Sequence, residues 1–414
     1  MEAIASDLDQ LDVIGPDTYA DNGYPHPAWK RLRQESPIHW FDLPDGVGFW
    51  AVTKRADIVW ISKQPTRFLN GPRLAVFEGG EPVEGERRFV RHLLNMDLPE
   101  HASYRNGASS WFTPRAIGRR KPEVERITRD LLAKMAGDGE EREADFVSDL
   151  TAPVTISVLA DMLGVPRDDW QLLFRWTNQI AGSSDPEFQG SGDDTVENTR
   201  NEMFQYFLRL VEKRRAEPRD DMVSVLANAQ VDGQPMPPLE LLSYYLLLVV
   251  AGNETTRNAA SGGLLALIEN PGELEKLRAN PRLVDTAVEE IVRWTTPVIQ
   301  FCRTPVEDVE IRGRKIRAGD ALCLFYPSAN RDEEVFEDGD VFRVDRRPNP
   351  HVGFGIGEHF CLGASLARLE LRVIFAELAH RLDSVELAGP YERMRSSFLG
   401  GVKRMPIRYR LKPT

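Results

Sequence analysis

Residues 354–363 read Phe-Gly-Ile-Gly-Glu-His-Phe-Cys-Leu-Gly, and they join a turn-rich stretch to a long helical pattern. Three glycines, Gly355, Gly357 and Gly363, let the backbone turn tightly around one cysteine. The first amide groups of the following helix can then donate to its sulfur. The spacing predicts a turn that stabilises Cys361 as a thiolate.

Other interpretations of this cysteine fit the sequence less well. A cysteine is in general more often an inert buried side chain than a ligand. Cys302, Cys323 and Cys361 lie too far apart in the sequence to indicate a disulfide framework or a zinc site. A cysteine hydrolase is disfavoured because His359 is only two residues from Cys361 and no orienting acid is evident.

The order Phe-Gly-x-Gly-x-His-x-Cys-x-Gly resembles the haem-thiolate loop of the cytochrome P450 monooxygenases at every fixed position. The resemblance implies that Cys361 is the axial ligand of haem iron and that Phe354 packs against the loop. It also implies that His359 reaches a haem propionate and that Gly363 belongs to the cofactor-binding turn. Haem b is the implied cofactor, and dioxygen is the implied co-substrate.

The composition is that of a soluble globular protein. The chain has 414 residues, of which 42% are hydrophobic and 28% charged, enough for one large core or for two or three domains. A net charge of -12 argues against a nucleic-acid or anionic-membrane binder. Residues 1–10 lack an apolar core and residues 244–252 are too short to span a bilayer, so no signal peptide or membrane anchor is expected. The three cysteines suit a reducing compartment, which predicts a cytoplasmic protein.

Helical periodicity dominates the chain, and we expect a helical core over about 100–295 and 362–382. It includes a long helix from about 238 to 269, which Pro271 stops. Strand-like patterns cluster at about 30–65, 297–325 and 384–414, with residues 49–52 as the clearest strand. Residues 69–95 are poorly patterned, as is typical of a functional or disordered loop.

This mainly α pattern with small sheets also resembles the cytochrome P450 fold along the whole chain. The resemblance implies a single domain over 1–414 and a monomer. It places haem between the long central helix and the helix after the cysteine loop.

Residues 251–256, in the middle of the long helix, read Ala-Gly-Asn-Glu-Thr-Thr. Leu248, Gly252 and Thr255 share one helical face, on which the glycine lets a flat cofactor approach closely. We expect the Thr255 hydroxyl to donate to the carbonyl of Ala251. The plain alternative is a packing glycine beside a satisfied threonine and a solvated glutamate.

The same stretch resembles the oxygen-activating motif Ala-Gly-x-Glu-Thr of the family. The resemblance implies that Glu254 and Thr255 relay protons to dioxygen at the haem iron, with Glu254 as the link to solvent. Ala251 and Gly252 are the neighbouring motif residues.

Glu290 and Arg293 are three residues apart on a predicted helix, where most such pairs are surface ion pairs of small consequence. Here they resemble the Glu-x-x-Arg element of the family. The resemblance implies a structural triad with an arginine that precedes the cysteine loop. Arg346 fits best, and the adjacent Arg347 is the rival.

Haem propionates need cationic or hydrogen-bonding partners. The resemblance implies four of them: His101 and Arg105, which lie one helical turn apart, Arg303 and His359. For His101 alone, an exposed residue at a helix start is the plain alternative.

The residues that contact the substrate are harder to predict from the sequence. The resemblance implies that it includes Val249, Val298, Ile299 and Leu399, which are apolar and favour an apolar substrate. The residues of these motifs resemble those of family members that hydroxylate steroids, terpenoids and branched lipids. A polyketide or an aromatic substrate is the alternative.

Electrons must come from another protein, because no Gly-x-Gly-x-x-Gly fingerprint is present. The resemblance implies an iron-sulfur ferredoxin with an NAD(P)H-dependent ferredoxin reductase. A docking patch is predicted, with a solvated face as the alternative. Its members are Arg115, Arg119, Arg120, Lys121, Arg368 and Arg372.

Two other functions would require different sets of these residues. A peroxide-driven haem-thiolate enzyme does not need the Glu254 and Thr255 relay. A non-catalytic haem-binding or sensor protein keeps Cys361 but needs neither relay nor reductase.

Overall fold

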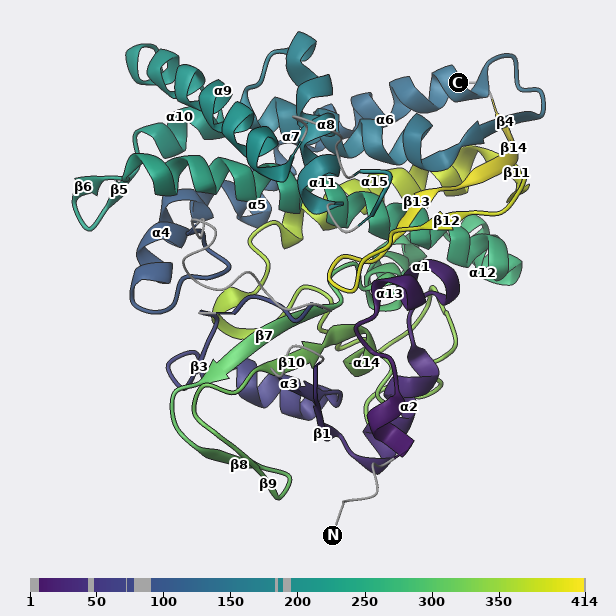
Figure 1. Cartoon of the computed structure of the whole chain (residues 1–414). Helices are drawn as coiled ribbons and strands as arrows, with labels where there is room; N and C mark the ends of the chain where they lie inside the picture. The colour runs from purple at the N-terminus through teal and green to yellow at the C-terminus, as the bar shows by residue number, and fades with distance from the viewer. Residues whose placement is uncertain are drawn as a thin grey trace.

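The structure is a computed structural model, and it describes residues 7–43, 48–71, 73–77, 91–182, 185–188 and 195–412. Its larger part is helical, and a five-stranded sheet lies in the part that contains the described N-terminal residues (Figure 1). The α-helices are α1 (Pro16–Asn22), α2 (His26–Glu35), α3 (Arg55–Ser62), α4 (Glu100–Ser109), α5 (Pro114–Gly118), α6 (Lys121–Ala136), α7 (Ala152–Leu163), α8 (Trp170–Ala181), α9 (Val196–Ala216), α10 (Met222–Ala227), α11 (Pro238–Glu269), α12 (Pro271–Ala279), α13 (Val284–Thr295), α14 (Tyr326–Ala329) and α15 (Ala364–Arg381).

The strands form a set of small sheets. They are β1 (Ile38–Phe41), β2 (Phe49–Val52), β3 (Phe68–Leu69), β4 (Arg142–Asp145), β5 (Gln230–Val231), β6 (Gln234–Pro235), β7 (Gln300–Pro305), β8 (Val309–Ile311), β9 (Arg314–Ile316), β10 (Leu322–Phe325), β11 (Leu382–Leu387), β12 (Glu392–Arg393), β13 (Val402–Arg404) and β14 (Pro406–Leu411). The largest sheet has the order β1-β2-β10-β7-β3, and a three-stranded sheet has the order β11-β14-β4. The expected mainly α architecture with small sheets is confirmed.

Helix α11 is the central element of the helical part, where it crosses the molecule (Figure 1). It begins at Pro238, whose missing N–H and fixed φ suit the first turn, and it ends at Glu269 before Pro271. It contacts α7, α8, α9, α13 and α15, so most of its length is buried in the main hydrophobic core. The predicted bounds of this helix are confirmed.

Two short pairings interrupt the region that was expected to be helical from 100 to 295. Strand β4 is four residues long and largely charged, and it forms because it adds an edge to β14 from the far end of the chain. Strands β5 and β6 make a small hairpin before α11. The purely helical expectation was wrong at both places, because neither segment carries an alternating apolar pattern of its own.

The segment 69–95 lies partly outside the described residues, which omit 72 and 78–90. Its described part at 73–77 is held against β7. The N–H of Cys302 donates to the carbonyl of Leu74 over 2.7 Å, and the side chain of Gln300 bonds both the N–H and the carbonyl of Val76. The sheet therefore fixes one edge of this segment.

Among the helices of the described residues, none is both long enough and apolar enough to cross a membrane.

Candidate functional site

A cavity with mainly apolar walls lies between α11, α4, β7 and the loop that precedes α15. It contains about 1760 Å³ of space free of protein atoms, part of which is open to solvent. Its walls include Cys361 from the loop and Thr255 from α11. The fold therefore brings the two strongest sequence motifs, which are about a hundred residues apart, to one cavity.

The cysteine loop is closed by its own backbone. The N–H of Cys361 donates to the carbonyl of Phe354 over 2.9 Å. Gly355 and Gly357 have φ of 68° and 79°, the left-handed region that favours glycine. A Cβ at Gly357 would lie 2.3 Å from the carbonyl oxygen of Ser62, so that position has no room for a side chain.

The sulfur of Cys361 meets opposing influences. Desolvation by the surrounding protein raises the pKa of its thiol although the residue is exposed at the cavity wall, whereas the N–H groups of Gly363 and Ala364 and the charges of Arg105 and Arg368 lower it. The amide donors expected from the sequence are present, but the desolvation outweighs them in the protein alone. A cation at the sulfur reverses that balance, which is the behaviour expected of a metal ligand.

One face of α11 borders the cavity. The Thr255 hydroxyl donates to the carbonyl of Ala251 over 2.8 Å, as expected. Gly252 also borders the cavity, and a Cβ there would lie 3.2 Å from Leu159 of α7. The glycine therefore serves close helix packing as well as the cavity wall.

Glu254 does not reach solvent, and the expectation that it would do so was wrong. Its side chain is 1% exposed and forms an ion pair with Arg257, one turn along the same helix. Arg257 in turn donates to the side chain of Asn178 in α8 over 3.0 Å. Burial raises the pKa of the Glu254 carboxyl although Arg257 opposes this. Glu254 does not line the cavity, because it lies on the side of α11 that faces α8.

The four candidate propionate partners all border the cavity. His101 is 1% exposed, and neither ring nitrogen has a hydrogen bond of good geometry among the described residues, although Nδ1 lies 3.5 Å from Oε1 of Glu358. Its ring lies 4.0 Å from that of His359, centroid to centroid. Arg303 is 4% exposed, and Arg105 donates to the carbonyl of Phe360 over 2.6 Å.

These residues fit a haem. Buried imidazole nitrogens without a hydrogen bond are costly, and a bound carboxylate would supply the hydrogen bond that Nε2 of His101 lacks. Haem has an iron that the sulfur of Cys361 can bind and carboxylates that the four candidate propionate partners can bind. The cavity also has space for the flat ring.

Glu290 lies in a buried ion-pair cluster. It is 0% exposed and accepts two hydrogen bonds of 2.7 Å from Arg293. Arg346 donates to it at 3.1 Å, so the partner is this arginine and not its neighbour Arg347. Asn349 and the N–H of Arg343 also donate to it. The cluster joins α13 to the segment before the cysteine loop.

Two of the four proposed substrate contacts lie on the cavity and two do not. Val298 and Leu399 border it and pair with each other through a backbone bridge. Val249 is buried in the main core on another face of α11. Ile299 points into a separate core cluster because successive residues of an extended chain face opposite sides. The predictions for Val249 and Ile299 were wrong.

Several cavity residues were missed from the sequence. Tyr244, Leu247 and Thr256 belong to the α11 face and follow from helical spacing around Gly252. Phe112 and Phe301 come from other segments and carry no local signal.

The predicted docking patch is partly paired within the chain. Arg368 pairs with Glu289, and Arg372 pairs with Asp285. Arg120 and Lys121 have acidic partners too. Arg115 and Arg119 are exposed, and the described residues give neither of them an ion-pair partner.

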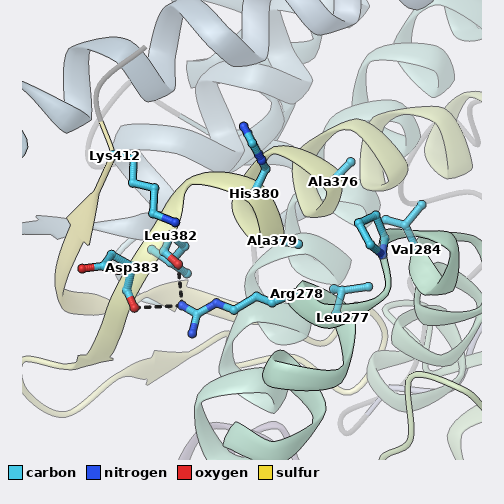
Figure 2. Close-up of a pocket in the computed structure, with 10 residues that line it drawn as sticks. Leu277, Arg278, Val284, Ala376, Ala379, His380, Leu382, Asp383 and Lys412 are labelled. Atoms are coloured by element: carbon cyan, nitrogen blue, oxygen red, sulfur yellow. Dashed lines mark hydrogen bonds between the residues drawn. The ribbon is translucent and has the colours of Figure 1, made fainter.

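A second cavity lies between α12, α15 and β11, and its volume on the same measure is about 1030 Å³ (Figure 2). Arg278 crosses it and donates to the carbonyl groups of Leu382 and Asp383, as Figure 2 shows. Its described lining contains no cysteine. The cavity at Cys361 is therefore the candidate functional site.

Comparison with known proteins gives consistent matches. Residues 84–389 match the family model described as Cytochrome P450. The steroid C26-monooxygenase of Mycolicibacterium smegmatis is 37% identical over 415 residues, which cover 98% of this chain and 94% of that protein. The methyl-branched lipid omega-hydroxylase of Mycobacterium tuberculosis is 38% identical over 409 residues, which cover 97% and 94%. A solved structure of a Mycobacterium marinum cytochrome P450 in complex with pseudoionone matches with a TM-score of 0.89 and 34% identity, over 98% of this chain and 100% of that one.

Proposed function

The chain belongs to the cytochrome P450 family and is a haem-thiolate monooxygenase that uses dioxygen, and we propose that it hydroxylates a branched apolar substrate. The proposed class comprises sterols, terpenoids and methyl-branched lipids. The observation that carries it is the mainly apolar cavity that Cys361 and the α11 face share. The relatives that act on a steroid and on a methyl-branched lipid support the same class.

When haem is bound, Cys361 would hold its iron through the sulfur, and His101, Arg105, Arg303 and His359 would hold its propionates; the group would supply oxygen activation. The mainly apolar walls of the cavity would then hold an apolar molecule and limit the access of water to the reacting carbon. Val298 and Leu399 border this space and are the proposed substrate contacts.

Thr255 and Glu254 are the proposed proton carriers. Thr255 presents Oγ1 at the cavity wall, within 2.8 Å of the Ala251 carbonyl. Glu254 is able to hold a proton because its carboxyl pKa is raised by burial, and its Oε1 has no hydrogen-bond partner among the described residues. Transfer from Glu254 requires a shift of its ion pair with Arg257.

Thr255→Ala should divert reducing equivalents to hydrogen peroxide. Product formed per electron should fall at least about tenfold, since a positioned acid–base group contributes about 10²- to 10⁴-fold. The measurement is the ratio of product to peroxide at a fixed amount of electron donor consumed. Thr256→Ala is the matched control because it also borders the cavity. An unchanged ratio in Thr255→Ala would remove this residue from the mechanism.

We also propose an iron-sulfur ferredoxin and its NAD(P)H-dependent reductase as electron donors. Arg115 and Arg119 are the basic residues left for docking, since Arg368 and Arg372 already have acidic partners. Charge reversal of both free arginines should slow electron transfer about tenfold at low salt and weaken its salt dependence. Arg209→Glu on α9 is the control. Equal rates in both variants would exclude this surface.

The experiment for the substrate class is an optical titration of the haem-loaded protein with sterols, terpenoids, branched and straight-chain lipids and aromatics. A molecule that fits the cavity beside the haem would change the haem spin state, which the absorption spectrum reports. Branched apolar molecules should give the largest change at the lowest concentration. A response to aromatics or polyketides alone would contradict the proposal. Steady turnover with peroxide alone would instead support the peroxide-driven alternative.

A further inference from the structure

Gln300, the first residue of β7, carries a buried amide that the proposed function does not use. The residue is 0% exposed, so its polar atoms need partners within the protein. Oε1 accepts from the N–H of Val76 at 3.0 Å and from the thiol of Cys323 at 2.8 Å. Nε2 donates to the carbonyl of Val76 at 2.6 Å and to that of Ser397 at 3.3 Å. Both donors and both acceptor positions of this amide are therefore occupied.

The amide joins three stretches of chain that are far apart in the sequence. They are β7 itself, the segment 73–77 and the segment 396–399. Val76 and Ser397 are buried, so water would not readily replace the amide at either carbonyl. A phenylalanine directly follows Gln300, and a phenylalanine directly follows each of its two backbone partners. These phenylalanines are Phe301, Phe77 and Phe398.

The three phenylalanines form one group of contacting rings, which we call the aromatic wall. The ring centroid of Phe398 lies 5.6 Å from that of Phe301 and 5.9 Å from that of Phe77. Both contacts are edge-on, a geometry that aromatic pairs favour. Phe301 and Phe398 also line the cavity at Cys361. The aromatic wall is therefore built from the stretches that Gln300 bonds.

Gln300 acts on this wall from behind. Successive residues of a strand face opposite sides, so Phe301 faces the cavity while Gln300 faces Cys323 in the sheet. Gln300 does not belong to the described lining of the cavity. The backbone adds one further bond, from the N–H of Ile299 to the carbonyl of Phe398 over 2.9 Å. Loss of the amide would therefore loosen the aromatic wall without detaching it.

We propose that Gln300 is a positioning residue for the substrate, because it fixes the place of Phe398 within the aromatic wall. This rests on the proposed function in one respect, the presence of an apolar substrate in this cavity. A misplacement of about 1 Å is enough to disturb a reacting geometry. The amide thus controls both the affinity for the substrate and the choice of the carbon that reacts.

The test compares haem-loaded wild-type protein with Gln300→Met, which keeps the length of the side chain and removes its hydrogen bonds. The probes are cholesterol, linalool and phytanic acid, which represent a sterol, a terpenoid and a methyl-branched lipid. The dissociation constant of the probe that wild type binds best, read from the haem spin state, should rise about tenfold, the effect of roughly one lost hydrogen bond. The share of the main product in turnover should fall as well. Cys323→Ala removes one bond to Gln300 and leaves both backbone segments bonded, so this matched control should behave as wild type.

Hydrogen exchange of backbone amides detects the loosening without any substrate. Peptides that contain Val76 or residues 396–399 should exchange faster in Gln300→Met than in wild type, while peptides of α11 should stay protected. The spectrum of the reduced carbon monoxide complex should not change, because the cysteine loop keeps its own bonds. Gln300→Asn keeps an amide but is too short to reach both backbone partners, so it should give the same changes in a milder form if the Met variant folds poorly.

A double variant tests whether the effect passes through the aromatic wall. Phe398→Leu alone should also weaken binding of the probe. Gln300→Met added to Phe398→Leu should weaken it little further, because residues that act through one contact are not additive. Full additivity of the two losses would contradict the role proposed for Gln300.

Two other outcomes would also overturn this role, and they differ. If Gln300→Met speeds exchange at these segments but leaves affinity and product pattern as in wild type, the amide is structural only and the proposed function stands. If wild type binds none of the three probes, the proposed function fails, and the positioning role fails with it.

Discussion

Cys361→Ala is expected to abolish monooxygenase activity and to leave any bound haem without a sulfur ligand. The reason is that no other described cysteine borders the cavity, since Cys302 and Cys323 are buried in the five-stranded sheet. The loss should be complete, because a change of axial ligand removes the electron donation on which oxygen activation depends. Activity with the electron-transfer partners and haem absorption are the two measurements.

Cys323→Ala is the matched control for this substitution. It removes a fully buried thiol that is not part of the cavity lining, so it should keep a normal haem spectrum and turnover. Normal turnover in Cys361→Ala would contradict the assignment of the ligand.

Glu290→Gln is expected to destabilise the folded protein by about 3–5 kcal/mol, the cost typical of breaking a buried ion pair from one side. It would leave Arg293, 1% exposed, and Arg346, 5% exposed, without their shared carboxylate. The free energy of unfolding from denaturant titration checks the size of the effect, and the yield of haem-loaded protein should fall with it.

Glu123→Gln gives the comparison for the Glu290 variant. Glu123 makes an ion pair of the same i,i+3 spacing with Arg126, but the side chains are 33% and 43% exposed. Its removal should cost less than about 1 kcal/mol. Equal costs at Glu123 and Glu290 would show that burial of the triad adds nothing to stability.

The features that depend only on residues close together in the sequence were the most predictable. The cysteine loop needs glycine at Gly355 and Gly357 for reasons of backbone geometry, so its shape can be read from the sequence. The ends of α11 follow from Pro238 and Pro271, and the bond from Thr255 to Ala251 follows from helical spacing. The structure shows each of these features as expected.

Other features depend on how distant segments meet. The choice of Arg346 over Arg347 depends on the path of an irregular segment, and β4 exists only because β14 lies beside it. The errors at Val249 and Ile299 have a similar cause, since both residues are apolar but face core clusters. Composition alone does not distinguish a residue that faces a core from one that faces a cavity.

Glu254 is the most instructive case. The sequence places an acid beside Thr255, but the ion pair with Arg257 and the link to Asn178 decide its exposure. The asparagine comes from α8, nearly eighty residues away, so helical spacing alone gives no sign of this contact.

The absorption spectrum of the reduced, carbon monoxide-bound protein tests the central claim most directly, because the position of its main band reports the axial ligand of haem. We expect a thiolate-type band in the wild-type protein and its loss in Cys361→Ala, with Cys323→Ala unchanged. A band typical of a nitrogen ligand in correctly folded wild-type protein would contradict the assignment of Cys361 as the haem ligand.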